Sequence, residues 1–268
     1  MQNILEAKNL VKEYSQTQGF FSRTKNIIRA LSQVSISIEK GKTLAVVGES
    51  GSGKSTLAKS LIKLIEVDDG SIYFEGVHLN SLTSAELKST RRNIQMVFQD
   101  PYASLNPRMK IKDILEEPLN IHNIDEPSGR QKKIKQMIIR VGLEEDDLKK
   151  YPHEFSGGQR QRIGIARALI LSPKLVICDE PVSALDVSVQ AQIIQLLKSL
   201  QKEFELTYLF ITHDLRIVRH IADRVFVMKE GKLMEQGKTD IIFKNPKTAY
   251  TKELLASIPG NRKLKRNK

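Results

Sequence analysis

The stretch GESGSGKST, residues 48–56, combines closely spaced glycines with one lysine and several hydroxyl side chains. Because glycine has no Cβ, it tolerates sharp bends and lets the backbone approach a ligand closely. Successive backbone N–H groups form a nest for an anion, and the lysine adds a point charge for the outer phosphates of a nucleotide. A hydroxyl group after the lysine is a candidate Mg²⁺ ligand. The spacing predicts a loop for a nucleoside triphosphate, made of Gly48, Glu49, Ser50, Gly51, Ser52, Gly53, Lys54, Ser55 and Thr56.

A strand before this loop and a helix after it are needed to position it. The residues 43–47, TLAVV, are apolar and partly β-branched, which predicts a buried parallel strand. After the loop, Leu57, Leu61, Leu64 and Ile65 recur at helical spacing without an intervening proline. The alternative is a glycine turn with an exposed lysine, which requires neither the strand before it nor the helix after it.

A second candidate site is the segment LVICDE, residues 175–180, in which apolar residues lead into two carboxylates. A buried strand of this kind places its acids at the carboxyl edge of a parallel sheet, where such folds bind ligands. Asp179 is the candidate Mg²⁺ ligand, and Glu180 is the candidate general base for the attacking water. Alone, such a pair often only caps the next turn; with the glycine loop it favours nucleotide chemistry.

The segment FSGGQRQR, residues 155–162, precedes a stretch with apolar residues at helical spacing. Ser156 is a favourable N-cap, and the two glycines that follow leave the helix N-terminus accessible to an anion. This segment is either an ordinary helix cap or a second phosphate site.

The order of the patterns predicts an α/β fold. Residues 4–14 and 34–38 alternate with period two, as in an antiparallel sheet with one buried face, and residues 19–25 between them indicate an exposed loop. A mostly helical region at about 100–171 interrupts the strand–helix alternation. We therefore expect a P-loop core with an N-terminal antiparallel β subdomain and an inserted helical subdomain.

Together these motifs resemble the ATP-binding subunits of ABC transporters, in the order of that family and over nearly the whole chain. The family signature Leu-Ser-Gly-Gly-Gln is matched with phenylalanine in place of leucine, at Phe155, Ser156, Gly157, Gly158 and Gln159. The resemblance implies an ABC-type fold in which two such domains enclose two ATP molecules head to tail. The signature of one domain then contacts the nucleotide held by the other.

The resemblance also implies roles for residues outside the glycine loop. Tyr14 matches the aromatic residue that stacks on adenine, and His213 matches the histidine at the γ-phosphate. Gln99 matches the glutamine that reaches the metal and the water, so the implied Mg²⁺ ligands are Ser55, Gln99 and Asp179. The loop that meets the partner subunit is matched by Ser183, Ala184, Leu185 and Asp186.

Residues 99–109, 151–169 and 245–259 are similar to the oligopeptide/dipeptide importer branch, and to its second (F-type) ATP-binding subunit. The usual His-Pro-Tyr-Thr is here Thr248-Ala249-Tyr250-Thr251. The resemblance implies an ATPase domain at 1–240 and a C-terminal extension at 241–268. It also implies a second ATPase subunit, self or paralogue, two integral membrane permease subunits and, indirectly, a substrate-binding protein.

Composition limits the remaining choices. The 43 Lys and Arg against 31 Asp and Glu leave a net charge of +12, which suggests a polyanionic partner or an anionic surface. The basic segment 261–268 is either a solvated end or a segment attracted to lipid headgroups.

Cys178 is the single cysteine, so we expect no iron–sulfur cluster, although some relatives carry one. No apolar run reaches about 18 residues and the start lacks an export signal. We expect a peripheral protein at the cytoplasmic face of the bacterial inner membrane.

Other functions fit less well. A DNA-associated ATPase of this superfamily would insert a coiled coil or a zinc module between Lys54 and Phe155, where the sequence has neither heptads nor cysteine. A GTPase would need an Asn-Lys-x-Asp motif, and a small-molecule kinase would not need the signature. We expect no nucleic-acid partner. Peptide is the first expectation for the cargo, with nickel or a cationic antimicrobial peptide as alternatives.

Overall fold

The computed structural model describes residues 2–17 and 25–258, and the chain divides into two compact units. The first unit comprises residues 1–82 and 209–268, and the second comprises residues 83–208. The basic segment 261–268 and all but the last residue of the loop expected at 19–25 lie outside the described residues.

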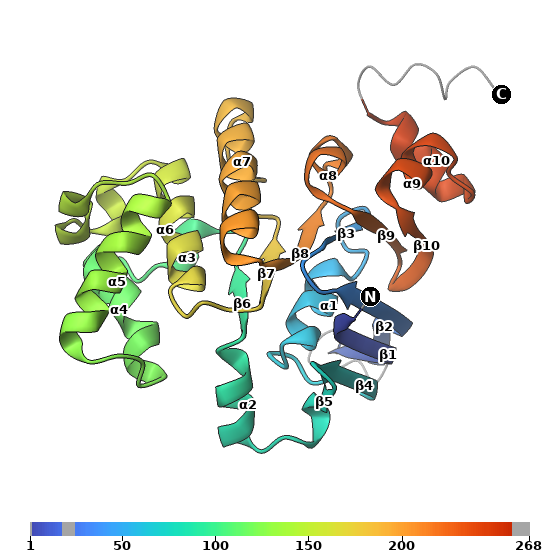
Figure 1. The fold of residues 1–268 in the computed structure, drawn as a ribbon. Helices are drawn as coiled ribbons and strands as arrows, with labels where there is room; N and C mark the ends of the chain where they lie inside the picture. Colours follow the sequence, from blue (N-terminus) through green and yellow to red (C-terminus); the bar gives the residue numbers. More distant parts are fainter. Residues whose placement is uncertain (1, 18–24, 259–268) are drawn as a thin grey trace. The chain divides into compact units, whose positions relative to one another are not determined.

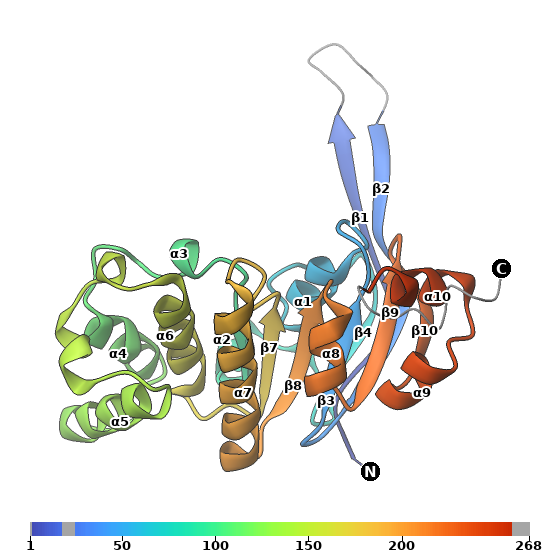
Figure 2. The same ribbon diagram turned by 90° about the horizontal axis from the view of Figure 1, so that it is seen from above.

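An antiparallel sheet with the strand order β2-β1-β4-β5 forms one layer of the first unit. Figure 1 shows its strands β1, β2 and β4 in blue to teal, and Figure 2 shows β1 and β2 side by side. Residues 34–38 of β2 alternate between buried and exposed, which confirms the predicted pattern of period two there. In β1 the pattern is interrupted at shifts in the strand register, where Ile4 and Leu5 are both buried and Lys8 and Asn9 are both exposed. The elements are β1 (Asn3–Thr17), β2 (Lys25–Glu39), β4 (Asp69–Phe74), β5 (Val77–His78) and the 3₁₀ turn η1 (Leu79–Ser81).

The second sheet of this unit has the strand order β10-β9-β3-β8. Strand β3 is buried at every residue and pairs in parallel with β9, with Ala45 opposite Val225. This confirms the buried parallel strand expected before the glycine loop. The bounds are β3 (Thr43–Val47), α1 (Lys54–Leu61), β8 (Thr207–Thr212), α8 (Leu215–Ile221), β9 (Arg224–Lys229), β10 (Lys232–Lys238), α9 (Thr239–Lys244) and α10 (Ala249–Ala256).

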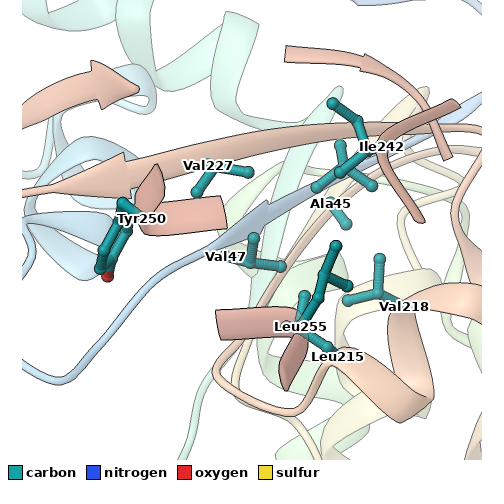
Figure 3. Close-up of a cluster of buried hydrophobic side chains, with 9 residues drawn as sticks. Ala45, Val47, Leu215, Val218, Val227, Ile242, Tyr250 and Leu255 are labelled. Carbon is teal, nitrogen blue, oxygen red and sulfur yellow. The ribbon is translucent and has the colours of Figure 1, made fainter. Parts of the chain in front are cut away.

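The C-terminal helices α9 and α10 pack on β3, the strand that leads into the glycine loop, and on its neighbour β9 (Figure 3). Burying these apolar side chains together ties the C-terminal helices to β3 and β9. The cluster consists of Ala45, Val47, Leu215, Val218, Val225, Val227, Ile242, Tyr250 and Leu255.

The second unit is mainly helical, and Figure 1 shows α4 to α6 grouped in green to yellow. Its strands β6 and β7 pair in parallel, with Ile94 opposite Leu175 and Val97 opposite Cys178. Its elements are α2 (Ser84–Arg91), β6 (Ile94–Val97), α3 (Pro101–Ser104), α4 (Ile111–Ile121), α5 (Pro127–Arg140), η2 (Glu145–Lys149), η3 (Pro152–Glu154), α6 (Gly157–Leu169), β7 (Leu175–Asp179) and α7 (Val187–Phe204).

Apolar faces on α4, α5 and α6 form the interior of this helical group. Helix α4 buries Ile111, Ile114, Leu115 and Leu119, and α5 buries Ile134, Met137 and Ile138. These residues recur at the three- and four-residue spacing that places side chains on one helical face. The helical region expected at about 100–171 is therefore present as α3 to α6.

The predicted helix after the glycine loop is shorter in the structure. Helix α1 ends at Leu61, so Leu64 and Ile65 do not continue it, and Leu64 is 50% exposed. The chain reverses there through Lys63, which has a φ of +55°. Among the described residues, the helices include none long and apolar enough to cross a membrane.

Cys178 should react slowly with a thiol reagent in the native protein. The residue is fully buried in β7, and burial, followed by the charge of Asp179, raises the pKa of its thiol. Since the thiolate is the reactive form, we expect labelling at neutral pH to be at least about a hundredfold slower than in denaturant. Absorbance after addition of an aromatic disulfide reagent measures both rates. Equal rates with and without denaturant would contradict the buried position of β7.

Candidate nucleotide-binding site

The glycine loop, residues 48–56, lies between β3 and α1 and packs against backbone from distant parts of the first unit. A Cβ added to Gly48 would lie 2.2 Å from the carbonyl oxygen of Met228 in β9. A Cβ added to Gly53, which has a φ of +99°, would lie 2.3 Å from the carbonyl oxygen of Ala30 in β2. Because carbonyl groups in paired strands cannot move aside cheaply, the loop needs glycine at both positions.

Lys54 begins helix α1 and turns its ammonium group back into the loop. The side chain is buried, and Nζ donates hydrogen bonds to the carbonyl oxygens of Gly48 at 2.8 Å and Glu49 at 2.7 Å. The N-cap of α1 is Gly53, which has no side chain to occupy the positive end of the helix. The loop therefore concentrates a buried positive charge beside a helix N-terminus, which is the electrostatic requirement for binding a phosphate.

The remaining loop residues lie at different depths. Ser52 is buried, whereas Glu49, Ser50 and Gly51 are exposed. Ser55 and Thr56 are half-buried in the first turn of α1. The structure thus brings the predicted loop residues together as one continuous turn into a helix.

Two further parts of the first unit hold the loop in place. The amide of Gly231, in the turn between β9 and β10, donates to the carbonyl of Ser52 at 3.0 Å. The carbonyl of Gly231 in turn accepts from the amide of Ser32 in β2 at 2.8 Å. The hydroxyl of Tyr250 in α10 accepts from the amide of Glu49 at 3.2 Å. The shape of the loop therefore depends on residues near both ends of the chain.

The other two predicted site residues of this unit lie where the sequence placed them, Tyr14 within a strand and His213 directly after one. Tyr14 lies on β1 with 38% of its surface exposed, and the Nζ of Lys12 lies 5.6 Å from the centroid of its ring. His213 is exposed and follows directly after β8. The next residue, Asp214, caps α8 by accepting from the amide of Arg216 at 2.8 Å.

In the second unit, the predicted acids stand at the end of β7. Asp179 is the last residue of the strand and is buried, and Glu180 directly after it is half-buried. Glu180 has a φ of +46°, a left-handed conformation that costs a non-glycine residue free energy. Its carboxylate accepts a long hydrogen bond of 3.4 Å from the amide of Gln99. The structure thus brings together two of the three residues predicted to be catalytic.

The predicted magnesium ligands have suitable donor chemistry. Ser55, Gln99 and Asp179 offer a hydroxyl, an amide and a carboxylate oxygen, and Asp179 is buried at the end of β7. Mg²⁺ prefers oxygen ligands and takes its remaining ones from water and phosphates. Within the described residues, His, Cys, Asp and Glu side chains form no group of three or more that could hold a metal ion without such help.

The signature segment forms the N-terminus of α6. Ser156 is the N-cap, and it forms a capping box with Gln159, each side chain bonding to the backbone of the other. The side chain of Phe155 is buried, so it packs inside the second unit. A Cβ added to Gly158 would lie 2.5 Å from Cγ1 of Val189, and one at Gly157 would lie 3.3 Å from Leu185. The glycines therefore also permit close packing of α6 against the start of α7.

The loop expected to meet a partner subunit, residues 183–186, leads into α7. Asp186 is the N-cap of that helix and accepts from the hydroxyl of Ser188 at 2.7 Å and the amide of Val189 at 3.0 Å. These hydrogen bonds hold the pKa of Asp186 below its usual value, so the cap stays ionised at neutral pH. The amide side chain of Gln190 donates to the carbonyls of Val182 and Leu185, which fixes the loop from within.

Two contacts in these sites could not be predicted, because no sequence pattern indicates them. One is the hydrogen bond between Tyr250 and the glycine loop. The other is the stacking of Arg160, the first residue after the signature, on the ring of Tyr102, at 3.6 Å from Cζ to the ring centroid. Arg160 also donates to the carbonyl of Pro152 at 2.6 Å. This contact links the segment after Gln99 to the signature helix.

Two family profiles match the chain. The profile described as "ABC transporter" matches residues 31–183, which include the glycine loop, the signature and the acids at the end of β7. The profile described as "Oligopeptide/dipeptide transporter, C-terminal region" matches residues 234–268, which include α9 and α10.

Individual proteins are similar over nearly the full chain. The oligopeptide transport ATP-binding protein AppF of Bacillus subtilis is 52% identical over 98% of this chain and 80% of its own length. OppF of Haemophilus influenzae is 52% identical over 93% of this chain and 75% of its own length. Among solved structures, the dimeric ATP-binding cassette MJ0796 bound to ADP and Pi has a TM-score of 0.77 and 32% identity, over 88% of this chain and 98% of its own. The chain therefore belongs to the family of ABC transporter ATP-binding proteins, in the branch that carries the oligopeptide/dipeptide transporter C-terminal region.

Proposed function

We propose that this protein is the ATP-hydrolysing subunit that energises a bacterial importer of oligopeptides or dipeptides. The observation that carries the proposal is the glycine loop itself, with Lys54 buried inside it and glycines required by contact with β2 and β9. The cargo follows from the relatives, which are named for oligopeptide and di/tripeptide transport.

Each site residue has a defined role in this proposal. The amides of the glycine loop and Lys54 hold the β- and γ-phosphates, and Tyr14 stacks on the adenine. Ser55, Gln99 and Asp179 would hold Mg²⁺, which would neutralise charge on the phosphates. Glu180 accepts a proton from the attacking water, and Gln99, 3.4 Å from it, helps to orient that water. His213 donates a hydrogen bond to the γ-phosphate.

The signature and the loop at 183–186 act on a second ATPase subunit, which is either another copy or a paralogue. Ser156, Gly157 and Gly158 contact the γ-phosphate held by that partner, and the amides at the N-terminus of α6 supply the donors. Related cassettes are described as dimeric, which supports this arrangement. The dimer docks at the cytoplasmic face of the membrane on two permease subunits, and a binding protein delivers the peptide. Residues 1–240 form the ATPase domain and 241–268 the extension, with no iron–sulfur cluster.

Replacing Lys54 by alanine should remove most MgATP binding. The substitution deletes a charge-assisted contact to phosphate, and the loss of about 1.5–3 kcal/mol corresponds to about ten- to a hundredfold in affinity. Isothermal titration of the purified protein measures the change. Lys59→Ala, on the same helix, is the matched control and should bind MgATP like the wild type. Equal affinity in the two variants would remove the phosphate-binding role of the loop.

Replacing Glu180 by glutamine should block hydrolysis while preserving ATP binding. The variant keeps the size of the side chain and cannot accept a proton, which should lower the rate by about 10²–10⁴-fold. Glu205→Gln is a matched control, because Glu205 also has a left-handed backbone in the same unit and lies at the end of α7.

The Glu180 variant should also accumulate as an ATP-bound dimer with its correct partner subunit, because each trapped ATP bridges the glycine loop of one subunit and the signature of the other. Phosphate release and light scattering with ATP measure both effects. Wild-type hydrolysis in Glu180→Gln would exclude Glu180 as the base. An inactive variant that never dimerises with self or a paralogue would contradict the role of the signature in trans.

Replacing Gly158 by alanine should impair ATP-dependent dimerisation and hydrolysis more than ATP binding. The added methyl group collides with Val189 and pushes the N-terminus of α6 away from the start of α7. Gly164→Ala is the control within the same helix, because its Cβ would meet no atom within 4 Å and alanine favours a helix by about 1 kcal/mol. Hydrolysis rates and melting temperatures of both variants test this. A normal rate in Gly158→Ala would show that the close packing is dispensable.

A further inference from the structure

A tyrosine in the C-terminal helix α10 contacts the glycine loop directly. The hydroxyl oxygen of Tyr250 accepts the backbone N–H of Glu49 at 3.2 Å, and the ring is only 6% exposed. Figure 3 shows this side chain in the cluster that also contains Val47, the last residue of β3, and Val227 of β9. The ring is therefore fixed by packing, and its hydroxyl is presented to one amide of the loop.

The helix that carries Tyr250 is itself anchored by a buried carboxylate. Glu235 of β10 accepts hydrogen bonds from the amides of Lys247 at 2.9 Å and Thr248 at 3.0 Å, and from the hydroxyl of Thr248 at 3.2 Å. Thr248 is the N-cap of α10 and accepts from the amide of Thr251 at 3.2 Å. The start of α10 is thus bound to β10 at three points. Rotation of the helix that would withdraw Tyr250 has to break these bonds.

The ring of Tyr250 also has a cation beside it. The Nζ of Lys229, the last residue of β9, lies 4.8 Å from the ring centroid. A cation over an aromatic face adds to the energy that holds the ring in one place. Neighbouring strands, a helix cap and a cation therefore all determine where the hydroxyl stands.

The amide that Tyr250 holds belongs to the part of the loop that also receives the lysine. Lys54 donates to the carbonyls of Gly48 and Glu49, while Tyr250 accepts from the amide of Glu49. The backbone of Glu49 is thus bonded at its carbonyl by the phosphate-binding lysine and at its amide by α10. Without the hydrogen bond from the Glu49 amide to Tyr250, this part of the loop is free to rotate. The carbonyl oxygens that accept from Lys54 are then no longer held in place.

We propose that Tyr250 is a positioning residue for the phosphate loop, through which the C-terminal region sets the loop's affinity for MgATP. The inference rests on the proposed role of residues 48–56 as the phosphate-binding loop. The hydroxyl touches no phosphate; it acts by holding the amide of Glu49 in the orientation that the filled loop requires. Pre-organising a binding loop raises affinity because less freedom is lost when the ligand binds.

The test is the full-length variant Tyr250→Phe, which removes only the hydroxyl. Its matched control is Tyr208→Phe, because Tyr208 is equally buried and its hydroxyl donates to the carbonyl of Leu197 at 3.0 Å instead of serving the loop. Loss of one hydrogen bond should raise the Kd and the KM for MgATP by about three- to tenfold in Tyr250→Phe. The kcat should stay within about twofold, and Tyr208→Phe should bind MgATP like the wild type.

Hydrogen exchange of the glycine loop distinguishes a positioning role of Tyr250 from a purely structural one. Peptides covering residues 48–53 should exchange faster in Tyr250→Phe than in the wild type, and at the wild-type rate in Tyr208→Phe. Unchanged affinity in Tyr250→Phe, with the loss expected for Lys54→Ala, would overturn the role of Tyr250 alone. An equal rise in Kd for both tyrosine variants would show general destabilisation and also overturn it. Unchanged affinity in both Tyr250→Phe and Lys54→Ala would overturn the phosphate-loop assignment as well.

Discussion

The contact of loop backbone with strand backbone at Gly48 is the constraint on which the first unit depends. The loop runs so close to the carbonyl of Met228 that no Cβ fits between them. At its other end, Gly53 meets the carbonyl of Ala30 in the same way. The loop is therefore pressed between β2 and β9, and its amides and lysine are already arranged before a phosphate arrives. Rigid placement of this kind strengthens the attraction between the loop and a phosphate, because no free energy is spent on ordering the loop at the moment of binding.

In the second unit, close side-chain contacts constrain the positions of the helices in a similar way. Gly158 lets α6 approach Val189 at the start of α7, and Arg160 stacks on Tyr102. These contacts connect the signature helix to the loop at 183–186 and to the segment after Gln99. The elements proposed to contact the nucleotide of the partner subunit therefore share a packed interior with those proposed to contact the nucleotide of their own subunit. A shift of either element is transmitted by contact, because close-packed interiors have little free volume to absorb it.

The sequence predicted which strands and helices carry the candidate site residues, because each of these motifs is local. The loop at 48–56, the acids after β7 and the cap at Ser156 each lie within a few residues, and their flanking strand and helix follow from hydrophobic periodicity. Long-range features left no such pattern. The end of α1 at Leu61 is set by a turn through Lys63, which apolar spacing does not reveal. The second reason for glycine at 158, the burial of Phe155 and the bond from Glu49 to Tyr250 all depend on residues that only the folded chain brings together.

Tyr250 and Glu49 are 201 residues apart, and the contacts of the loop with Met228 and Gly231 span almost as much of the chain. This separation has a consequence for how the protein is made on the ribosome. A nascent chain that already contains the complete loop still lacks the strand, the turn and the helix that give the loop its shape. Contacts so distant in sequence form late and slowly, because a long segment must close first. The loop can therefore complete these contacts only after the chain has been synthesised past Tyr250, and until then the nascent loop lacks part of the support that fixes its shape.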